Sequence, residues 1–288
     1  MRRRPAGMTI DEAAPAKINL ALHVTGRRSD GYHLLDSLVV FVGVGDRIQV
    51  SAAESTNLAV SGPMAAGVPV GPENLVLRAA TLFQPAIPAR ITLTKHLPAA
   101  AGIGGGSADA AACLRALAEL GGRELPSAEA ALSLGADVPA CLMGRTLRMG
   151  GVGEDLAALP PLPPLWLVLV NPRVSVSTPA VFAHLRDRAN APMSALPNGA
   201  GQGDFLDWLQ SQRNDLQDAA CHIAPIIRDV LEMISETSGC RLARMSGSGA
   251  TFFGVFTGPD AADDAARQIV QACPDWWCQT APVLTSVR

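Results

Sequence analysis

The stretch that most constrains this fold is LPAAAGIGGGSADAAACLRAL, residues 97–117, where three consecutive glycines and a serine directly precede a helical pattern. Glycine costs backbone entropy and adds no packing, so a cluster at a helix start must gain something from its missing side chains. A helix N-terminus has unpaired N–H groups and the positive end of the helix dipole. Small residues let an anion approach these groups, and phosphate is the common occupant. The stretch therefore predicts a phosphate-binding loop with Ser107 at the helix N-cap, able to reach a phosphate oxygen or a metal ion.

Two familiar phosphate motifs do not match this loop. The P-loop pattern requires a lysine after its glycines, and none follows here. The dinucleotide fingerprint G-x-G-x-x-G does not fit Gly102, Gly104, Gly105 and Gly106. A flexible turn is the simple alternative, but the cluster adjoins the start of a helix rather than its end.

The rest of the chain reads as a mixture of strands and helices. Residues 17–24, KINLALHV, alternate as a half-buried strand whose open face carries Lys17, Asn19, Ala21 and His23. Further strands are predicted at residues 90–96, at 165–170, and on both sides of a Ser/Gly turn in 241–256. Helices are predicted from the glycine loop to residues 121–122, at 178–188 with Thr178 as cap and Pro179 first, and at 224–239. Without strict alternation, this order indicates an α+β fold.

Two domains are predicted, residues 1–160 and 161–288. The length of 288 residues allows one large domain or two ordinary ones. The best boundary is AALPPLPPL, residues 157–165, where four prolines stiffen the chain between two patterned halves.

Composition excludes several functional classes. A net charge of −3 and a pI near 5.9 leave no electrostatic footprint for nucleic acid or an anionic membrane, and the arginines at positions 2–4 are expected to be a solvated tail. The apolar runs are too short to span a bilayer, so a soluble cytoplasmic protein is expected. The six cysteines form no CxxC pair, and Cys113 and Cys141 are predicted to be buried. The five histidines form no HxxxH pair, which argues against a protein-built zinc site.

Residues 98–108, PAAAGIGGGSA, resemble the ATP loop of the GHMP kinases. Three more stretches, at residues 15–37, 134–154 and 245–256, are similar to one branch of that family, in the family order and at the family spacing. That branch phosphorylates the cytidine diphosphate conjugate of methylerythritol on the non-mevalonate route to isoprenoids. The resemblance implies a two-domain α+β GHMP kinase fold, ATP as cofactor, an active site between the domains, and a monomer or homodimer. Mg²⁺ is expected on charge grounds, with no ligands assigned.

The resemblance also implies roles for particular residues. Asp137 corresponds to the catalytic base and Lys17 to its electrostatic partner, suited to phosphoryl transfer by positioning and charge stabilisation. The predicted ATP loop consists of Pro98, Ala99, Ala100, Ala101, Gly102, Ile103, Gly104, Gly105, Gly106, Ser107 and Ala108. The predicted substrate contacts are Asn19, Tyr32, His33, Thr178 and Phe182. The predicted active-site turn contains Gly247, Ser248 and Gly249.

Structural alternatives exist for most of these residues when they are taken singly. Asp137 also suits a helix N-cap, Lys17 a solvated strand position, and Tyr32 with His33 a turn. Phe182 also suits an apolar core. At positions 100 and 101 the family often has glycine, and alanine is tolerable there unless the backbone needs a positive φ.

Three rival functions remain open from the sequence. The nearest is another GHMP kinase, for a mevalonate- or homoserine-type alcohol, which would need no cytidine site. A non-catalytic nucleotide- or sugar-binding protein of the same fold would not need both Lys17 and Asp137. A dinucleotide-dependent oxidoreductase is the most distant.

Overall fold

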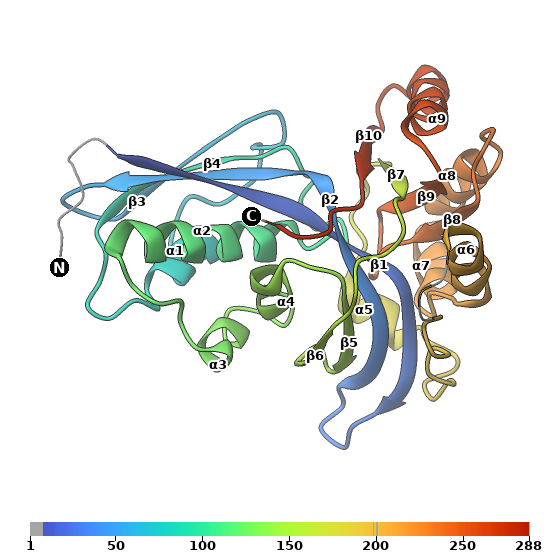
Figure 1. Cartoon of the computed structure of the whole chain (residues 1–288), viewed down its shortest axis with the longest axis horizontal. Coiled ribbons are helices and arrows are strands. Elements are labelled where there is room, and N and C mark those ends of the chain that lie inside the picture. The colour runs from blue at the N-terminus through green and yellow to red at the C-terminus, as the bar shows by residue number, and fades with distance from the viewer. Residues whose placement is uncertain (1–7, 198, 200, 288) are drawn as a thin grey trace.

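The computed structural model of the chain describes residues 8–197, 199 and 201–287, so the arginines at positions 2–4 lie outside the described residues. The described strands form two sheets, one built from the first half of the chain and one from the second (Figure 1). Both long strands at the start of the chain, β1 and β2, run from the first sheet towards the second half, where the two parts meet (Figure 1).

The first sheet has the strand order β3-β4-β2-β5-β6, with β1 paired to β2. Only the β3–β4 pair is parallel among the pairs of this sheet. Its strands are β1 (Thr9–Arg27), β2 (His33–Ala52), β3 (Asn57–Ser61), β4 (Ala89–Thr94), β5 (Leu147–Gly151) and β6 (Asp155–Ala158). The accompanying helices are α1 (Leu75–Ala80), α2 (Gly105–Gly121), α3 (Ala128–Leu132) and α4 (Val138–Met143). Helix α2 packs its alanine-rich face against β1 and β2, with α1 beside it.

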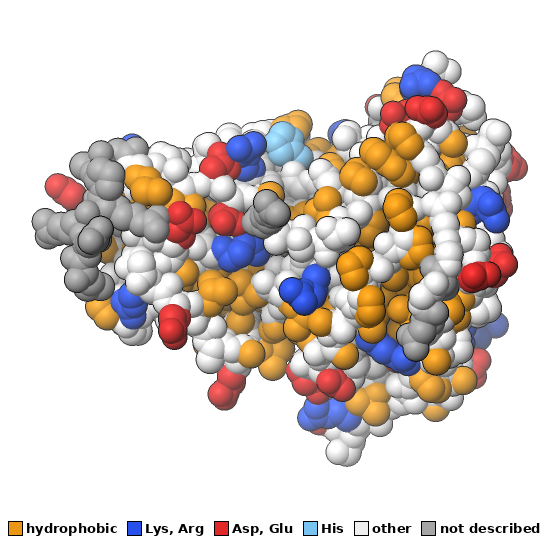
Figure 2. All heavy atoms as spheres, in the orientation of Figure 1, with side chains coloured by type: hydrophobic (Ala, Val, Ile, Leu, Met, Phe, Trp, Pro, Cys, Tyr) orange, Lys and Arg blue, Asp and Glu red, His pale blue; other side chains and the backbone are white. Residues whose placement is uncertain are grey.

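The second sheet is antiparallel throughout and has the order β10-β7-β9-β8. Its strands are β7 (Trp166–Asn171), β8 (Leu242–Met245), β9 (Phe252–Phe256) and β10 (Trp277–Pro282). Its helices are α5 (Thr178–Ala183), α6 (Gln202–Ser211), α7 (Gln217–Ile223), α8 (Ile226–Ser235) and α9 (Pro259–Ala272). The predicted boundary at residue 160 falls between β6 and β7. Hydrophobic side chains gather over this half of the molecule in Figure 2.

Apolar side chains from both sheets join the two halves. Ile18 and Leu38 of the first sheet share a buried cluster with Leu167 and Phe253 of the second. The backbone of Leu22 in β1 also exchanges hydrogen bonds with the segment before α7, because its N–H donates to the Arg213 carbonyl and its carbonyl accepts from Asp215 N–H. Strand β1 is therefore covered by both halves of the chain.

This double covering corrects the prediction of a half-buried strand at residues 17–24. Lys17, Asn19, Ala21 and His23 were expected on an open face, and all four are buried. The pairing of β1 with β2 shifts register between Asn19 and Ala21, so the alternation is also interrupted. A bulge of this kind re-aims the side chains around it.

Several other predicted elements are confirmed. Strands β8 and β9 and helix α8 lie within the predicted ranges, and α2 ends at Gly121 with Gly122 as its left-handed cap. Strands β4 and β7 overlap their predicted ranges, 90–96 and 165–170, with ends displaced by one or two residues. The helix predicted at 178–188 is shorter and ends at Ala183. Its cap is also different: Ser177 accepts from Ala180 N–H, so Thr178 is the first helical residue. Across the described part of the chain, none of the helices combines the length and apolar character needed to cross a bilayer.

Candidate active site

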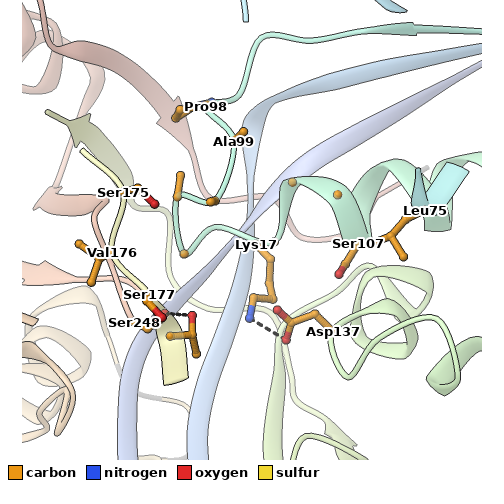
Figure 3. Close-up of a pocket in the computed structure, with 18 of the residues that line it drawn as sticks. Lys17, Leu75, Pro98, Ala99, Ser107, Asp137, Ser175, Val176, Ser177 and Ser248 are labelled. Atoms are coloured by element: carbon orange, nitrogen blue, oxygen red, sulfur yellow. Dashed lines mark hydrogen bonds and ion pairs between the residues drawn. The ribbon is translucent and has the colours of Figure 1, made fainter. Parts of the chain in front are cut away.

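A cavity of about 780 Å³ lies where the two halves meet. Its walls come from β1, the glycine loop, the start of α4, the Ser/Gly turn between β8 and β9, and the segment leading into α5. Figure 3 shows these elements converging, with Lys17 and Ser107 pointing towards Asp137. The cavity thus brings together five stretches that are separated in the sequence.

The glycine loop enters α2 through Gly104, and this corrects the prediction that Ser107 is the N-cap. Gly104 is the N-cap residue in the left-handed conformation, with φ 66°, and Ser107 lies in the first turn. A Cβ at Gly104 would lie 3.1 Å from the Lys17 Cβ, a tight contact, and the positive φ itself favours glycine at this position. Since no side chain caps α2, the N–H groups of its first turn remain available to an anion.

Nine of the eleven predicted loop residues line the cavity, and two do not. Ile103 is buried in the apolar cluster between the sheets, and Ala108 in the core of the first half. The loop is held by its backbone on both sides: Lys17 N–H donates to the Ile103 carbonyl at 2.9 Å and Ser246 Oγ to the Gly102 carbonyl at 3.1 Å. The two core side chains therefore anchor the loop while its neighbours face the cavity.

Lys17 and Asp137 form an ion pair at the centre of this wall. The Lys17 Nζ lies 2.9 Å from Asp137 Oδ1 (Figure 3). The lysine side chain is 5% exposed, whereas the aspartate is 33% exposed and open to the cavity. Asp137 occupies the N-cap position of α4 but makes no capping hydrogen bond, because its carboxylate faces Lys17 instead. The pair therefore offers a carboxylate held by a buried cation.

Polar groups continue along the cavity from the second half of the chain. Thr178 Oγ1 lies 2.6 Å from Ser248 Oγ, which ties the start of α5 to the Ser/Gly turn. Gly247 also lines the cavity, whereas Gly249 packs behind it against the glycine loop. On the β1 side, Asn19 donates to Ser37 Oγ at 2.7 Å, and its own Oδ1 is buried without a hydrogen-bond partner.

Tyr32, His33 and Phe182 are placed differently from one another. His33 stacks on Phe182 with ring centroids 4.8 Å apart, and its Nε2 is buried without a partner. Burial, assisted by the charges of Arg27 and Arg188, lowers the pKa of His33. Tyr32 is 65% exposed, and only Phe182 of the three lines the cavity. The stacked pair leaves no room for a base between His33 and Phe182, so any sandwich on Phe182 must use its other face.

The sequence reasoning missed one side of the cavity. Lys95 and Asp109 form its buried floor, and the segments 67–69 and 73–75 extend it beyond α2. Asp109 could have been noticed as a charged residue on the apolar face of a helix. Lys95 gave no such signal, since it follows an ordinary alternating strand.

The described residues contain no group of three or more His, Cys, Asp or Glu side chains arranged to hold a metal ion. The oxygen donors at the start of α2 and α4 are the Ser107 hydroxyl and the Asp137 carboxylate, which line the same cavity. Such a sparse set suits Mg²⁺, which keeps several waters and is usually bound through one or two protein groups together with substrate phosphates.

Comparison with known protein families shows to which family this chain belongs. The family described as "GHMP kinases N terminal domain" matches residues 74–145, which include the glycine loop and Asp137. The family described as "GHMP kinases C terminal" matches residues 195–275. The chain belongs to the GHMP kinases. This confirms the family resemblance and the two-domain α+β fold expected from it.

Curated relatives that are more than half identical to this GHMP kinase share one name. It is 55% identical to the 4-diphosphocytidyl-2-C-methyl-D-erythritol kinase of Ruegeria pomeroyi over 96% of this chain and 100% of that protein. It is 56% identical to the protein of the same name from Dinoroseobacter shibae, over 96% of this chain and 95% of that protein. A crystal structure of 4-(cytidine 5'-diphospho)-2C-methyl-D-erythritol kinase matches with TM-score 0.78 and 38% identity, covering 94% of this chain and 99% of that one. Homoserine kinase from Cytophaga hutchinsonii, at 16% identity and TM-score 0.70, shares the fold.

Proposed function

We propose that this GHMP kinase transfers the γ-phosphoryl group of ATP to the 2-hydroxyl of 4-diphosphocytidyl-2-C-methyl-D-erythritol, a step in isoprenoid precursor synthesis by the non-mevalonate route. The observation that carries the proposal is the Lys17–Asp137 ion pair in the same cavity as the uncapped N-terminus of α2. The names of relatives more than half identical over nearly the whole chain supply the substrate. The homoserine kinase from Cytophaga hutchinsonii, at 16% identity, supports only the fold.

Different groups of the chain bind the phosphates, accept the proton and stabilise the negative charge. The first-turn N–H groups of α2 and the side-chain-free surface of the glycine loop bind the phosphates of ATP. Asp137 accepts the proton of the acceptor hydroxyl as that oxygen attacks the γ-phosphorus. Lys17 stabilises the carboxylate and the negative charge on the transferring group. Since the phosphates occupy the middle of the cavity, its extension along segments 67–69 and 73–75 is the place for the adenosine.

The cytidine end is assigned to the opposite side of the cavity. Phe182 lines it there and offers a ring face for stacking, with His33 fixed behind it. The unpartnered Asn19 Oδ1 and the Thr178 hydroxyl are hydrogen-bonding groups for the substrate. Tyr32, on its exposed turn, is proposed to cover the base when the substrate is bound.

Mg²⁺ is proposed to enter with ATP, where it would neutralise phosphate charge. Ser107, whose hydroxyl lines the cavity at the start of α2, is the residue that would hold it together with the phosphate oxygens. We also propose that residues 1–160 and 161–288 are the two domains and that the protein acts in the cytoplasm. Six free cysteines agree with a reducing compartment.

The test is an ADP-release assay with ATP, Mg²⁺ and 4-diphosphocytidyl-2-C-methyl-D-erythritol, run beside the same substrate without its cytidine diphosphate. Turnover of the full substrate alone is the expected result. Equal turnover of both would contradict the cytidine site, and turnover of homoserine or mevalonate instead would identify a different GHMP kinase.

Asp137→Asn tests the proposed base. We expect turnover to fall by about 10²- to 10⁴-fold, since general base catalysis contributes on that order, with little change in ATP binding. Asp155→Asn, on the exposed strand β6, is the matched control and should retain activity. Near-normal turnover of Asp137→Asn would remove Asp137 as the base.

A further inference from the structure

A buried arginine in the second half of the chain contacts strand β1. Arg244 lies on β8 and is only 5% exposed. Its Nη1 donates a hydrogen bond to the Leu20 carbonyl of β1 at 2.8 Å. Its Nη2 donates to the carbonyls of Leu209, at 3.1 Å, and Gln212, at 2.7 Å. One guanidinium therefore connects β8 with β1 and with the C-terminal end of α6.

Carbonyl groups, and not a carboxylate, surround the charge of Arg244. None of the ion pairs among the described residues includes this arginine. Burial lowers its pKa to about 10, so the guanidinium is still positively charged near neutral pH. Leu209 and Gln212 lie in the last turn and at the C-cap of α6, where the helix dipole favours a cation. Because the guanidinium has five N–H donors, a single side chain can serve three carbonyls.

The carbonyl of β1 that Arg244 contacts belongs to a β-bulge. The pairing of β1 with β2 shifts register between Asn19 and Ala21, so Leu20 has no partner on β2. A bulge leaves one residue outside the ladder and changes the direction of the side chains next to it. Arg244 therefore supplies the hydrogen bond that β2 does not give to Leu20.

Further hydrogen bonds fix the shape of this bulge. Asn19 N–H donates to Ser246 Oγ, directly after β8, at 3.1 Å. Asn19 Nδ2 donates to Ser37 Oγ, which in turn donates to the Ala21 carbonyl, both at 2.7 Å. Asn19 Oδ1 is left without a hydrogen-bond partner, and Asn19 lines the cavity. The shape of the bulge thus determines where this free acceptor atom lies.

We propose that Arg244, together with Ser246, is a positioning residue for the phosphoryl acceptor: the two side chains hold the bulge of β1 in the shape that directs Asn19 to the substrate. This rests on the proposed function, in which Asn19 binds the acceptor. Neither Arg244 nor Ser246 is among the described residues that line the cavity, so both act through β1.

The effect of Arg244 is expected on the acceptor and not on ATP. The glycine loop has its own contacts with the rest of the chain, since the Ile103 carbonyl accepts from Lys17 N–H and the Ala101 carbonyl from Thr251 N–H. Arg244 makes none of these hydrogen bonds. Loss of its guanidinium should therefore leave the phosphate-binding loop in place.

Arg244→Met tests the assignment, because methionine keeps an apolar stem and removes the guanidinium. We expect kcat/KM for 4-diphosphocytidyl-2-C-methyl-D-erythritol to fall about 10- to 100-fold, mainly through a higher KM, because a small misplacement of a positioning group has effects of that order. The Kd for a non-hydrolysable ATP analogue with Mg²⁺ should remain close to that of wild type. Arg244→Lys keeps one cationic donor and should recover part of the loss. Arg241→Met, at an exposed position just before β8, is the matched control and should leave both values unchanged.

A purely structural role for Arg244 would give a different result. The variants would then melt at a lower temperature, but their folded molecules would have the wild-type KM for the acceptor. Kinetics are therefore measured well below the melting temperature of each variant. A wild-type acceptor KM in folded Arg244→Met would overturn the proposal.

Ser246→Ala tests the second contact, and with Arg244→Lys it decides the matter if Arg244→Met does not fold. It removes the hydroxyl that accepts from Asn19 N–H, so the acceptor KM should rise. Since Ser246 Oγ also donates to the Gly102 carbonyl, the affinity for the ATP analogue should fall in this variant as well. An acceptor KM that is unchanged in both Ser246→Ala and Arg244→Lys would contradict the proposal.

Hydrogen exchange separates this inference from the proposed function. If wild type does not phosphorylate the acceptor, the proposed function fails, and exchange of the backbone amides decides the role of Arg244. Amides of residues 19–22 should then exchange faster in Arg244→Lys than in wild type, while those of the glycine loop stay unchanged. Equal exchange in β1 would overturn the positioning role. If wild type is active and the variants keep its acceptor KM, the kinase assignment stands and the positioning role is wrong.

Discussion

At the scale of single residues, Ala100 has a backbone conformation that its side chain disfavours. It lies in the glycine loop with φ 50°, a left-handed conformation that alanine adopts at a cost in free energy. Alanine was expected to be tolerable here unless the backbone takes a positive φ, and the backbone does take one. Its neighbour Ala99 has no positive φ.

Ala100→Gly is therefore expected to stabilise the protein by about 0.5–1 kcal/mol, because relief of the left-handed strain exceeds the entropy gained by the unfolded chain. Ala99→Gly, one residue earlier, is the matched control. It should destabilise the protein by a similar amount, because glycine there raises the entropy of the unfolded chain without relieving any strain in the folded state. Urea unfolding of both variants measures the difference. A loss of stability in both would show that Ala100 is not strained.

At the scale of elements, the glycine loop and the Ser/Gly turn behave as one unit. A Cβ at Gly102 would come within 2.6 Å of the Gly249 carbonyl oxygen and 2.7 Å of the Ser246 carbonyl oxygen. Thr251 N–H also donates to the Ala101 carbonyl at 3.2 Å. The turn therefore acts as a wall that sets the position of the loop, and glycine at 102 permits the close backbone contact.

Gly102→Ala is expected to weaken ATP binding by about tenfold or more, because the clash must displace the loop or the turn. Gly122→Ala is the control, since Gly122 has a similar left-handed φ but no atom within 4 Å of the new Cβ. Both variants should lose stability through backbone strain, and only Gly102→Ala should lose nucleotide affinity, measured by titration. If the two variants bound the nucleotide equally well, the contact between the turn and the loop would have no influence on nucleotide binding.

At the scale of the whole molecule, the C-terminal segment ties the second half to the helix that carries Asp137. After β10 the chain passes back over the first sheet (Figure 1), where Leu284 N–H donates to the Phe41 carbonyl at 2.8 Å. Val287 N–H then donates to the carbonyl of Gly144, the C-cap of α4, at 2.6 Å. Because Asp137 is the N-cap of this six-residue helix, the segment helps to hold the proposed base in place.

Val287→Asp is expected to remove the apolar contact of this segment with the first-half core, at a cost of about 1–2 kcal/mol. The expected kinetic result is a lower kcat with little change in the KM for ATP, as α4 loosens while the glycine loop stays in place. Val270→Asp, at an exposed position on α9, is the matched control and should leave both unchanged. An unchanged kcat for Val287→Asp would show that the C-terminal segment does not help to hold Asp137 for the reaction.

Local sequence patterns were sufficient to predict those helices and strands whose structure depends on their own residues. The helix after the glycines, its end at Gly121, and the strands β7, β8 and β9 follow from periodicity and from residues with restricted backbones. Helix caps were less certain: Ser107 and Thr178 have the right chemistry, yet Gly104 and Ser177 take the cap positions. A cap depends on the path of the preceding chain, which the loop's tertiary contacts determine.

From the sequence alone came several of the elements, the family resemblance and the two residues at the centre of the proposed chemistry, because each of these depends on a short run of adjacent residues. Only the tertiary structure decided that Lys17 meets Asp137 across 120 positions, that β1 is covered on both faces, and that Lys95 and Asp109 form the floor of the cavity. Burial and charge pairing are properties of what surrounds a side chain, and those surroundings come from distant parts of the chain.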